Sequence, residues 1–124
     1  MSRVFESSFY VNSFHAVNSE TKEVYTPDAE GYITAKAGDE IVFENPYCPS
    51  EYVPVNTITF FTKDSPLKVE INPGLKNSIY PLYVPSNDKK GIQYMRIDKI
   101  VVLDDCTFYY EGLASWGDSH AIYI

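Results

Sequence analysis

Hydrophobic and polar residues alternate one by one in several short segments, which is the pattern of β-strands that bury one face. The clearest example is Leu67–Ile71, where Leu, Val and Ile alternate with Lys and Glu just before the turn residues Asn-Pro-Gly at 72–74. Residues 40–44, after a turn at 37–39, and residues 57–60 show the same alternation. Each segment is predicted to be a strand with one face inward.

A β-hairpin is predicted near the C-terminal end, with arms at 92–103 and 106–111 and Asp104-Asp105 at the turn. The second arm places three side chains on one face: Cys106, Phe108 and Tyr110. The first arm places four on one face: Met95, Ile97, Val101 and Leu103. Lys99 interrupts that face, so a bulge or bend is expected near Asp98 and Lys99.

The remaining strand patterns are weaker, and they predict strands at 3–11, 32–36, Ile79–Val84 and 121–124. The longest loop is expected at 44–54, and a polar turn at 117–120. Apolar residues do not recur at helical spacing in any long window, and the eight prolines argue further against helix. The prediction is a single all-β domain over residues 1–124, an antiparallel β-sandwich or jelly roll with little helix.

Charge and composition exclude some partners. The net charge is −7, the wrong sign for neutralising phosphates, so nucleic acid and anionic membranes are not expected partners. A helix needs about 20 consecutive apolar residues to span a bilayer, and the sequence contains no such run. The start of the chain does not resemble a secretory signal. Cys48 and Cys106 could pair, but free thiols are the better expectation for a protein made in the cytoplasm.

Candidate catalytic and metal-binding residues do not form a recognisable set. The segment Gly-Asp-Ser-His at 117–120 resembles the Gly-Asp-Ser block of a lipase-like hydrolase family, but only four residues follow it, which leaves no place for the base and its orienting acid. Residues 36–45 resemble a strand-leading segment of cupredoxins. The copper ligands of that family are not matched, because Cys106 and His120 are too far apart. With His15 as the only other histidine, no enzyme activity, cofactor or metal is expected.

Tyrosine is unusually frequent, with eleven residues against seven Phe and one Trp. Its large apolar ring and hydroxyl suit surfaces that must be both packed and wettable. We therefore expect contact residues among the aromatic and C-terminal side chains, namely Tyr47, Tyr52, Tyr109, Trp116, Tyr123 and Ile124. The simpler alternative is that these residues only cover sheet edges and the second face of the core.

Part of the C-terminal half resembles the small structural proteins of tailed bacteriophages. The resemblance is carried by Ile-Asn-Pro-Gly at 71–74, Ile-Tyr-Pro at 79–81, the run at 95–105 and Phe-Tyr-Tyr-Glu-Gly at 108–112. It implies a non-enzymatic β-sandwich of the virion, in a decoration, fibre or tail role, that binds other virion proteins and copies of itself. The alternative is a carbohydrate-binding module in which exposed Tyr residues or Trp116 stack on sugar rings.

Overall fold

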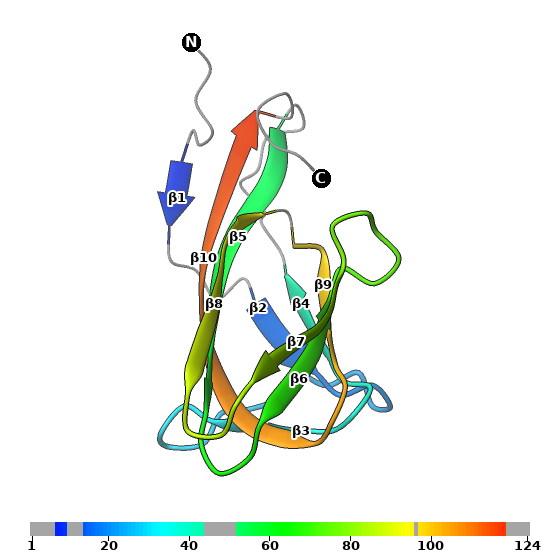
Figure 1. The fold of residues 1–124 in the computed structure, drawn as a ribbon, viewed down its shortest axis with the longest axis vertical. Helices are drawn as coiled ribbons and strands as arrows, with labels where there is room; N and C mark the ends of the chain where they lie inside the picture. The colour runs from blue at the N-terminus through cyan, green and yellow to red at the C-terminus, as the bar shows by residue number, and fades with distance from the viewer. Residues whose placement is uncertain (1–6, 10–13, 44–51, 96, 119–124) are drawn as a thin grey trace.

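The computed structural model describes residues 7–9, 14–43, 52–95 and 97–118, and every regular element in these ranges is a β-strand. These ten strands form two antiparallel sheets that pack face to face, which confirms the predicted sandwich (Figure 1). The first sheet, sheet A, contains β1 (Ser7–Phe9), β3 (Ile33–Ala35), β5 (Tyr52–Thr62), β8 (Lys89–Met95) and β10 (Cys106–Asp118). Sheet B contains β2 (Phe14–Val17), β4 (Glu40–Phe43), β6 (Leu67–Ile71), β7 (Ile79–Val84) and β9 (Lys99–Val102).

The strand order is that of a jelly roll. From β3 onward the chain alternates between the sheets except at the β6–β7 hairpin, and the two orders are β3-β10-β5-β8 and β4-β9-β6-β7. β1 and β2 extend these sheets, since β1 pairs with the far end of β10 and β2 pairs with β4. Jelly rolls occur in viral capsid proteins, lectins and cupins, so the topology by itself is compatible with several functions.

The core lies between the two sheets and follows the predicted alternation. In β6 the side chains of Leu67, Val69 and Ile71 are buried while Lys68 is exposed. Phe60 of β5 and Phe108 of β10 meet edge to face, with ring centroids 6.1 Å apart. Other core side chains come from both sheets: Ile33, Ala35, Ile41, Ile58, Val84, Ile97, Ile100, Val102 and Cys106. One continuous core therefore holds the described strands together.

The predicted hairpin between 92–103 and 106–111 is wrong. β9 pairs with β4 and β6 in sheet B, whereas β10 pairs with β3, β5 and β1 in sheet A. The Asp104-Asp105 segment therefore carries the chain from one sheet to the other. The Asp105 carboxylate accepts a hydrogen bond from the Ala37 N–H at 2.9 Å, which ties this corner to the turn before β4. Short spacing and turn residues alone cannot distinguish such a crossing from a hairpin.

The predicted inward face of the first arm is correct at Ile97 and wrong at Val101 and Leu103, and the Met95 side chain is not among the described ones. Ile97, Ile100 and Val102 are buried, while Val101 and Leu103 are only partly buried. The expected break near Asp98 is present, since β8 ends at Met95 and β9 begins at Lys99. The buried Asn72 side chain accepts a hydrogen bond from the Asp98 N–H at 2.7 Å and so fixes this link. The link resets the alternation, which is why the faces shift.

Some predicted boundaries change, and some lie outside the described residues. Residues 52–54 belong to β5 instead of the predicted loop, and Gly117 and Asp118 belong to β10 instead of a turn. The predicted strand at 3–11 corresponds to Ser7–Phe9 within the described part. The strand expected at 121–124, residues 44–51 of the expected loop, and Cys48 lie outside the described residues.

The sheet edges are protected against pairing with another strand. On the edge strand β7, Pro81 has no N–H to offer to another strand, and it lies where the pairing with β6 is irregular, between Ile79 and Leu82. On β8 the exposed Lys89 and Lys90 place charges at the edge. The edge of β2 is covered by Val24 of the following segment, which bridges to Val17.

Candidate functional site

An aromatic cluster lies on the outward face of sheet A, formed by Tyr32, Phe61 and Tyr109, and is called the aromatic face below. Phe61 of β5 and Tyr109 of β10 are directly paired in the sheet, and their rings stack with centroids 4.4 Å apart and planes 9° apart. Tyr32, just before β3, meets Tyr109 edge to face at 5.4 Å. All three side chains are partly exposed, because the neighbouring residues Phe60 and Phe108 point into the core instead.

Charged side chains surround the aromatic face. The Lys63 ammonium lies 5.1 Å from the centroid of the Tyr32 ring and 3.6 Å from a Glu30 carboxylate oxygen. The Tyr109 hydroxyl donates a hydrogen bond to Glu111 Oε1 at 2.9 Å. This bond, together with burial, raises the pKa of Tyr109, so the hydroxyl remains a proton donor at neutral pH. An apolar centre with a polar rim is the usual composition of a protein contact surface.

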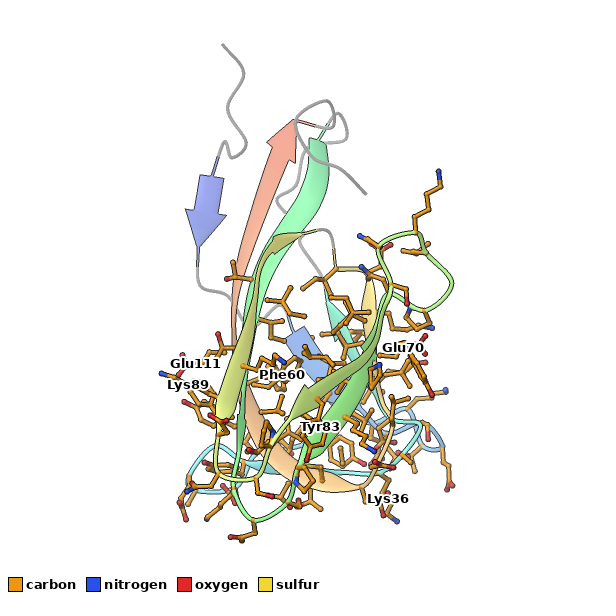
Figure 2. All side chains as sticks on the ribbon, in the orientation of Figure 1. Lys36, Phe60, Glu70, Tyr83, Lys89 and Glu111 are labelled. Carbon is orange, nitrogen blue, oxygen red and sulfur yellow. The ribbon has the colours of Figure 1, made fainter. Side chains whose placement is uncertain are left out.

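A hollow of about 380 Å³ adjoins the aromatic face at the start of β8. Its lining consists of Tyr32, Phe61, Thr62, Asn87, Asp88 and Lys89. Figure 2 labels Lys89 and Glu111 on this side of the sandwich. The hollow gives the aromatic face a concave border into which a partner side chain could fit.

The predicted contact residues are spread over more than one region. Tyr109 belongs to the aromatic face. Strand alternation correctly predicts that its side chain points away from the face that carries Phe108 and Tyr110. Tyr52 and Trp116 lie near the far ends of β5 and β10, where Tyr52 pairs with Asp118 and Trp116 pairs with Pro54. These strand ends extend beyond sheet B (Figure 1), and Trp116 is about 23 Å from Tyr109 along the strand. Tyr47, Tyr123 and Ile124 lie outside the described residues.

Sequence reasoning missed several exposed aromatic side chains. Tyr80 and Tyr83 on β7 are 69% and 43% exposed, and neither was expected at a contact surface. Phe61 and Tyr32 were also missed as partners of Tyr109. The double Phe at 60 and 61 was a usable signal, because alternation must turn one of the two rings outward.

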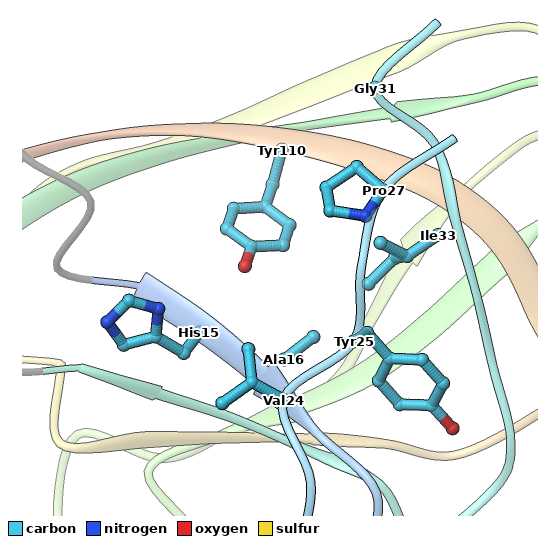
Figure 3. Close-up of a pocket in the computed structure, with 8 residues that line it drawn as sticks. All are labelled: His15, Ala16, Val24, Tyr25, Pro27, Gly31, Ile33 and Tyr110. Atoms are coloured by element: carbon cyan, nitrogen blue, oxygen red, sulfur yellow. The ribbon is translucent and has the colours of Figure 1, made fainter. Parts of the chain in front are cut away.

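A separate pocket of about 340 Å³ lies between β2, residues 24–31 and β10, and Figure 3 shows its lining. Tyr110, whose ring packs against the core, projects its hydroxyl into this space. Burial raises the pKa of Tyr110. A hydrogen bond between its hydroxyl and the Ala16 backbone lowers the pKa by less, so the net shift is upward. The hydroxyl thus links the two sheets and stays protonated at neutral pH.

A buried carboxylate fixes the wall of this pocket. Asp39, only 1% exposed, accepts hydrogen bonds from the backbone N–H groups of Ser19 at 2.9 Å and Lys36 at 2.8 Å, and from the Tyr25 hydroxyl. Burial raises the pKa of Asp39, but these hydrogen bonds together outweigh burial and hold the pKa below its ordinary value. The segment that carries Tyr25 is thereby anchored to the turn before β4.

Within the described residues, no group of three or more His, Cys, Asp or Glu side chains is placed to hold a metal ion. Cys106 is a free thiol in the core, and burial raises its pKa, so it is a poor nucleophile. None of the described segments forms a helix that could cross a membrane. His120 lies outside the described residues, and His15 is in the pocket beside Tyr110.

Comparison with known proteins adds no relative. No family model matches the chain, and neither a curated protein nor a solved structure matches it.

Proposed function

We propose that the protein is a non-catalytic structural or decoration subunit of a virion, which acts through protein–protein contacts made by the aromatic face. The observation that carries the proposal is the stacked pair of Phe61 and Tyr109 on the outer surface of sheet A. Large aromatic side chains dominate the energetics of protein interfaces, especially where they are surrounded by polar groups that exclude water.

The surroundings of the aromatic face support this role. Lys63 and Glu111 supply charges of both signs at its rim, so a second copy or another subunit can find complementary partners there. The rings are held by their own stacking and by the paired strands beneath them. A preorganised surface loses little side-chain entropy when it binds.

Two further features support the virion assignment. The first is the resemblance of the C-terminal half to small structural proteins of tailed bacteriophages. The second is the jelly-roll order of β3 to β10, an architecture that viral capsid proteins use. Because jelly rolls also serve lectins, this second argument is one of analogy.

The strand ends that extend beyond sheet B offer a second contact region. There β1, β5 and β10 form a ribbon that carries Tyr52 and Trp116. A ribbon that projects from a compact sandwich can reach a neighbouring subunit without distorting the core. We propose that it contributes to assembly together with the aromatic face.

Light scattering coupled to size-exclusion chromatography tests the proposal. The wild type should form a discrete oligomer, and the double variant Phe61→Ser with Tyr109→Ser should be a folded monomer, because polar residues on the outward face leave the core intact. The matched control, Tyr80→Ser with Tyr83→Ser, removes exposed aromatic rings from β7 and should keep the wild-type mass. An unchanged mass for the Phe61 and Tyr109 variant would rule out the aromatic face, and a wild type that is monomeric at every concentration would contradict self-assembly.

A further inference from the structure

Lys89 and Glu111 flank the ring pair of the aromatic face on opposite sides. Strand register places Lys89 of β8 and Tyr109 of β10 on either side of Phe61, so the three side chains share the outward face of sheet A. Glu111 follows Tyr109 by one step on that same face. Lys89 and Glu111 are both exposed. The face therefore carries opposite charges at two separated positions.

Lys89 and Glu111 do not neutralise each other within one chain. They lie on the two strands that flank β5, one step apart along the strand direction, which puts their Cα atoms about 12 Å apart. Among the described residues, neither side chain forms an ion pair. Glu111 accepts the Tyr109 hydroxyl through Oε1, which leaves Oε2 for another donor. Both charges are available to a partner.

A second copy of the chain can supply both complementary charges. A two-fold rotation about an axis in the plane of the contact exchanges two positions when the axis passes midway between them. Midway between Lys89 and Glu111 lies β5, at Thr59 and Phe61. Lys89 of each copy then faces Glu111 of the other, and the Phe61 rings of the two copies meet beside the axis. Packed sheets lie about 10 Å apart, a gap that a Lys and a Glu side chain can bridge together.

The overall charge makes the two lysines of this face important. Two copies of a chain with a net charge of −7 repel each other. A contact between copies therefore needs cations inside the contact patch. The aromatic face has Lys63 over the Tyr32 ring and Lys89 beside Phe61.

We infer that the partner of the aromatic face is a second copy of this chain, in a two-fold contact with the aromatic rings at its centre and two ion pairs between Lys89 and Glu111 at its rim. The inference rests on the proposed function, because it names the partner of the same face. A patch that carries both members of an ion pair at separated positions is complementary to itself, as a two-fold contact requires. The two ion pairs also fix the register of the contact.

Charge reversal, read by sedimentation velocity on the folded full-length protein, tests the inference. The wild type should contain an even number of copies. Glu111→Lys and Lys89→Glu each place like charges together at both ends of the contact, so each should weaken self-association at least tenfold. An equimolar mixture of these two variants should restore association to within threefold of the wild type, because both ends of a mixed contact again pair opposite charges.

The matched controls are Lys68→Glu and Glu70→Lys on β6, which make the same charge changes in sheet B and should each keep the wild-type mass. Single variants at Lys89 and Glu111 that associate as the wild type does, a mixture that stays dissociated, or an odd-numbered assembly would overturn the inference. So would a monomeric wild type, which leaves the aromatic face to a different virion subunit.

The double variant Phe61→Ser with Tyr109→Ser separates this inference from the proposed function. If that variant loses assembly while the mixture of charge variants is not restored, only the two-fold arrangement fails. If that variant keeps the wild-type mass, the aromatic face itself is not the contact surface, and both fail.

Discussion

Replacing Asp39 with Asn should destabilise the protein strongly, although the two side chains have nearly the same shape. One carboxylate oxygen accepts the Ser19 N–H, and the other accepts the Lys36 N–H and the Tyr25 hydroxyl. Asparagine keeps one acceptor oxygen and replaces the other with an NH₂ donor. Whichever way the amide is turned, at least one backbone N–H then faces another donor.

The expected loss of unfolding free energy follows from these bonds. A hydrogen bond to a charged group contributes about 1.5–3 kcal/mol, and a buried donor left without an acceptor adds its own cost. Because Asp39 is 1% exposed, solvent hardly screens these interactions. We expect Asp39→Asn to lose about 2–4 kcal/mol near neutral pH and Asp39→Ala, which removes both acceptor oxygens, to lose about 3–5 kcal/mol.

The effect of Asp39→Asn should also depend on pH. The folded protein holds the pKa of Asp39 below its ordinary value of 3.8, so the stabilising contribution is present above that value. It is lost as the pH falls through the lowered pKa, because the folded carboxylate is then protonated. The difference in unfolding free energy between the wild type and Asp39→Asn should therefore shrink in acid.

Urea unfolding followed by circular dichroism, near pH 7 and near pH 3, measures this difference. Using the difference between the two proteins cancels the contributions of the other carboxylates. A loss below about 0.5 kcal/mol near neutral pH, the range of an ordinary surface substitution, would refute the reasoning. So would a difference that stays the same at both pH values.

Three further predictions concern the sandwich itself. Pro81→Val restores a backbone N–H on the edge strand β7 and should promote aggregation, which light scattering during storage would detect; unchanged solubility would contradict the edge argument. Phe108→Ala opens a cavity where Phe108 meets Phe60 and should cost about 3–5 kcal/mol in urea unfolding, whereas a loss under about 1 kcal/mol would not fit a fully buried ring. Cys106 should react with a thiol reagent only as fast as the protein opens, because its side chain is buried in the core. A rate equal to that of the unfolded chain would show that the thiol is exposed.

The local pattern of the sequence predicts much of the fold. Alternation in Leu67–Ile71 and at residues 106–110 correctly identifies the side chains that face the core, because each strand packs one face against the same core. The turns at 37–39 and 72–74 are also correct, and Gly38 and Asn72 adopt the positive φ values of 94° and 51° that such turns require. These features depend only on residues close together in the chain.

Long-range features could not be predicted in this way. Whether Asp104-Asp105 closes a hairpin or joins two sheets depends on which strands lie beside β9 and β10, and those partners come from distant parts of the chain. The aromatic face has the same origin. Tyr109 could be placed on an outward face from alternation, but its stacking on Phe61 follows from the register between β5 and β10. The pocket depends on Tyr25 being held by Asp39, fourteen residues away.

Hydroxyl-radical footprinting of the wild type, at high dilution and in its assembled form, tests the central claim most directly. If the aromatic face is the contact surface, oxidation of Tyr32, Phe61 and Tyr109 should fall severalfold on assembly, while Tyr80 and Tyr83 on β7 keep their rates. Equal oxidation of Tyr32, Phe61 and Tyr109 in both forms would contradict the account, as would protection confined to Tyr80 and Tyr83.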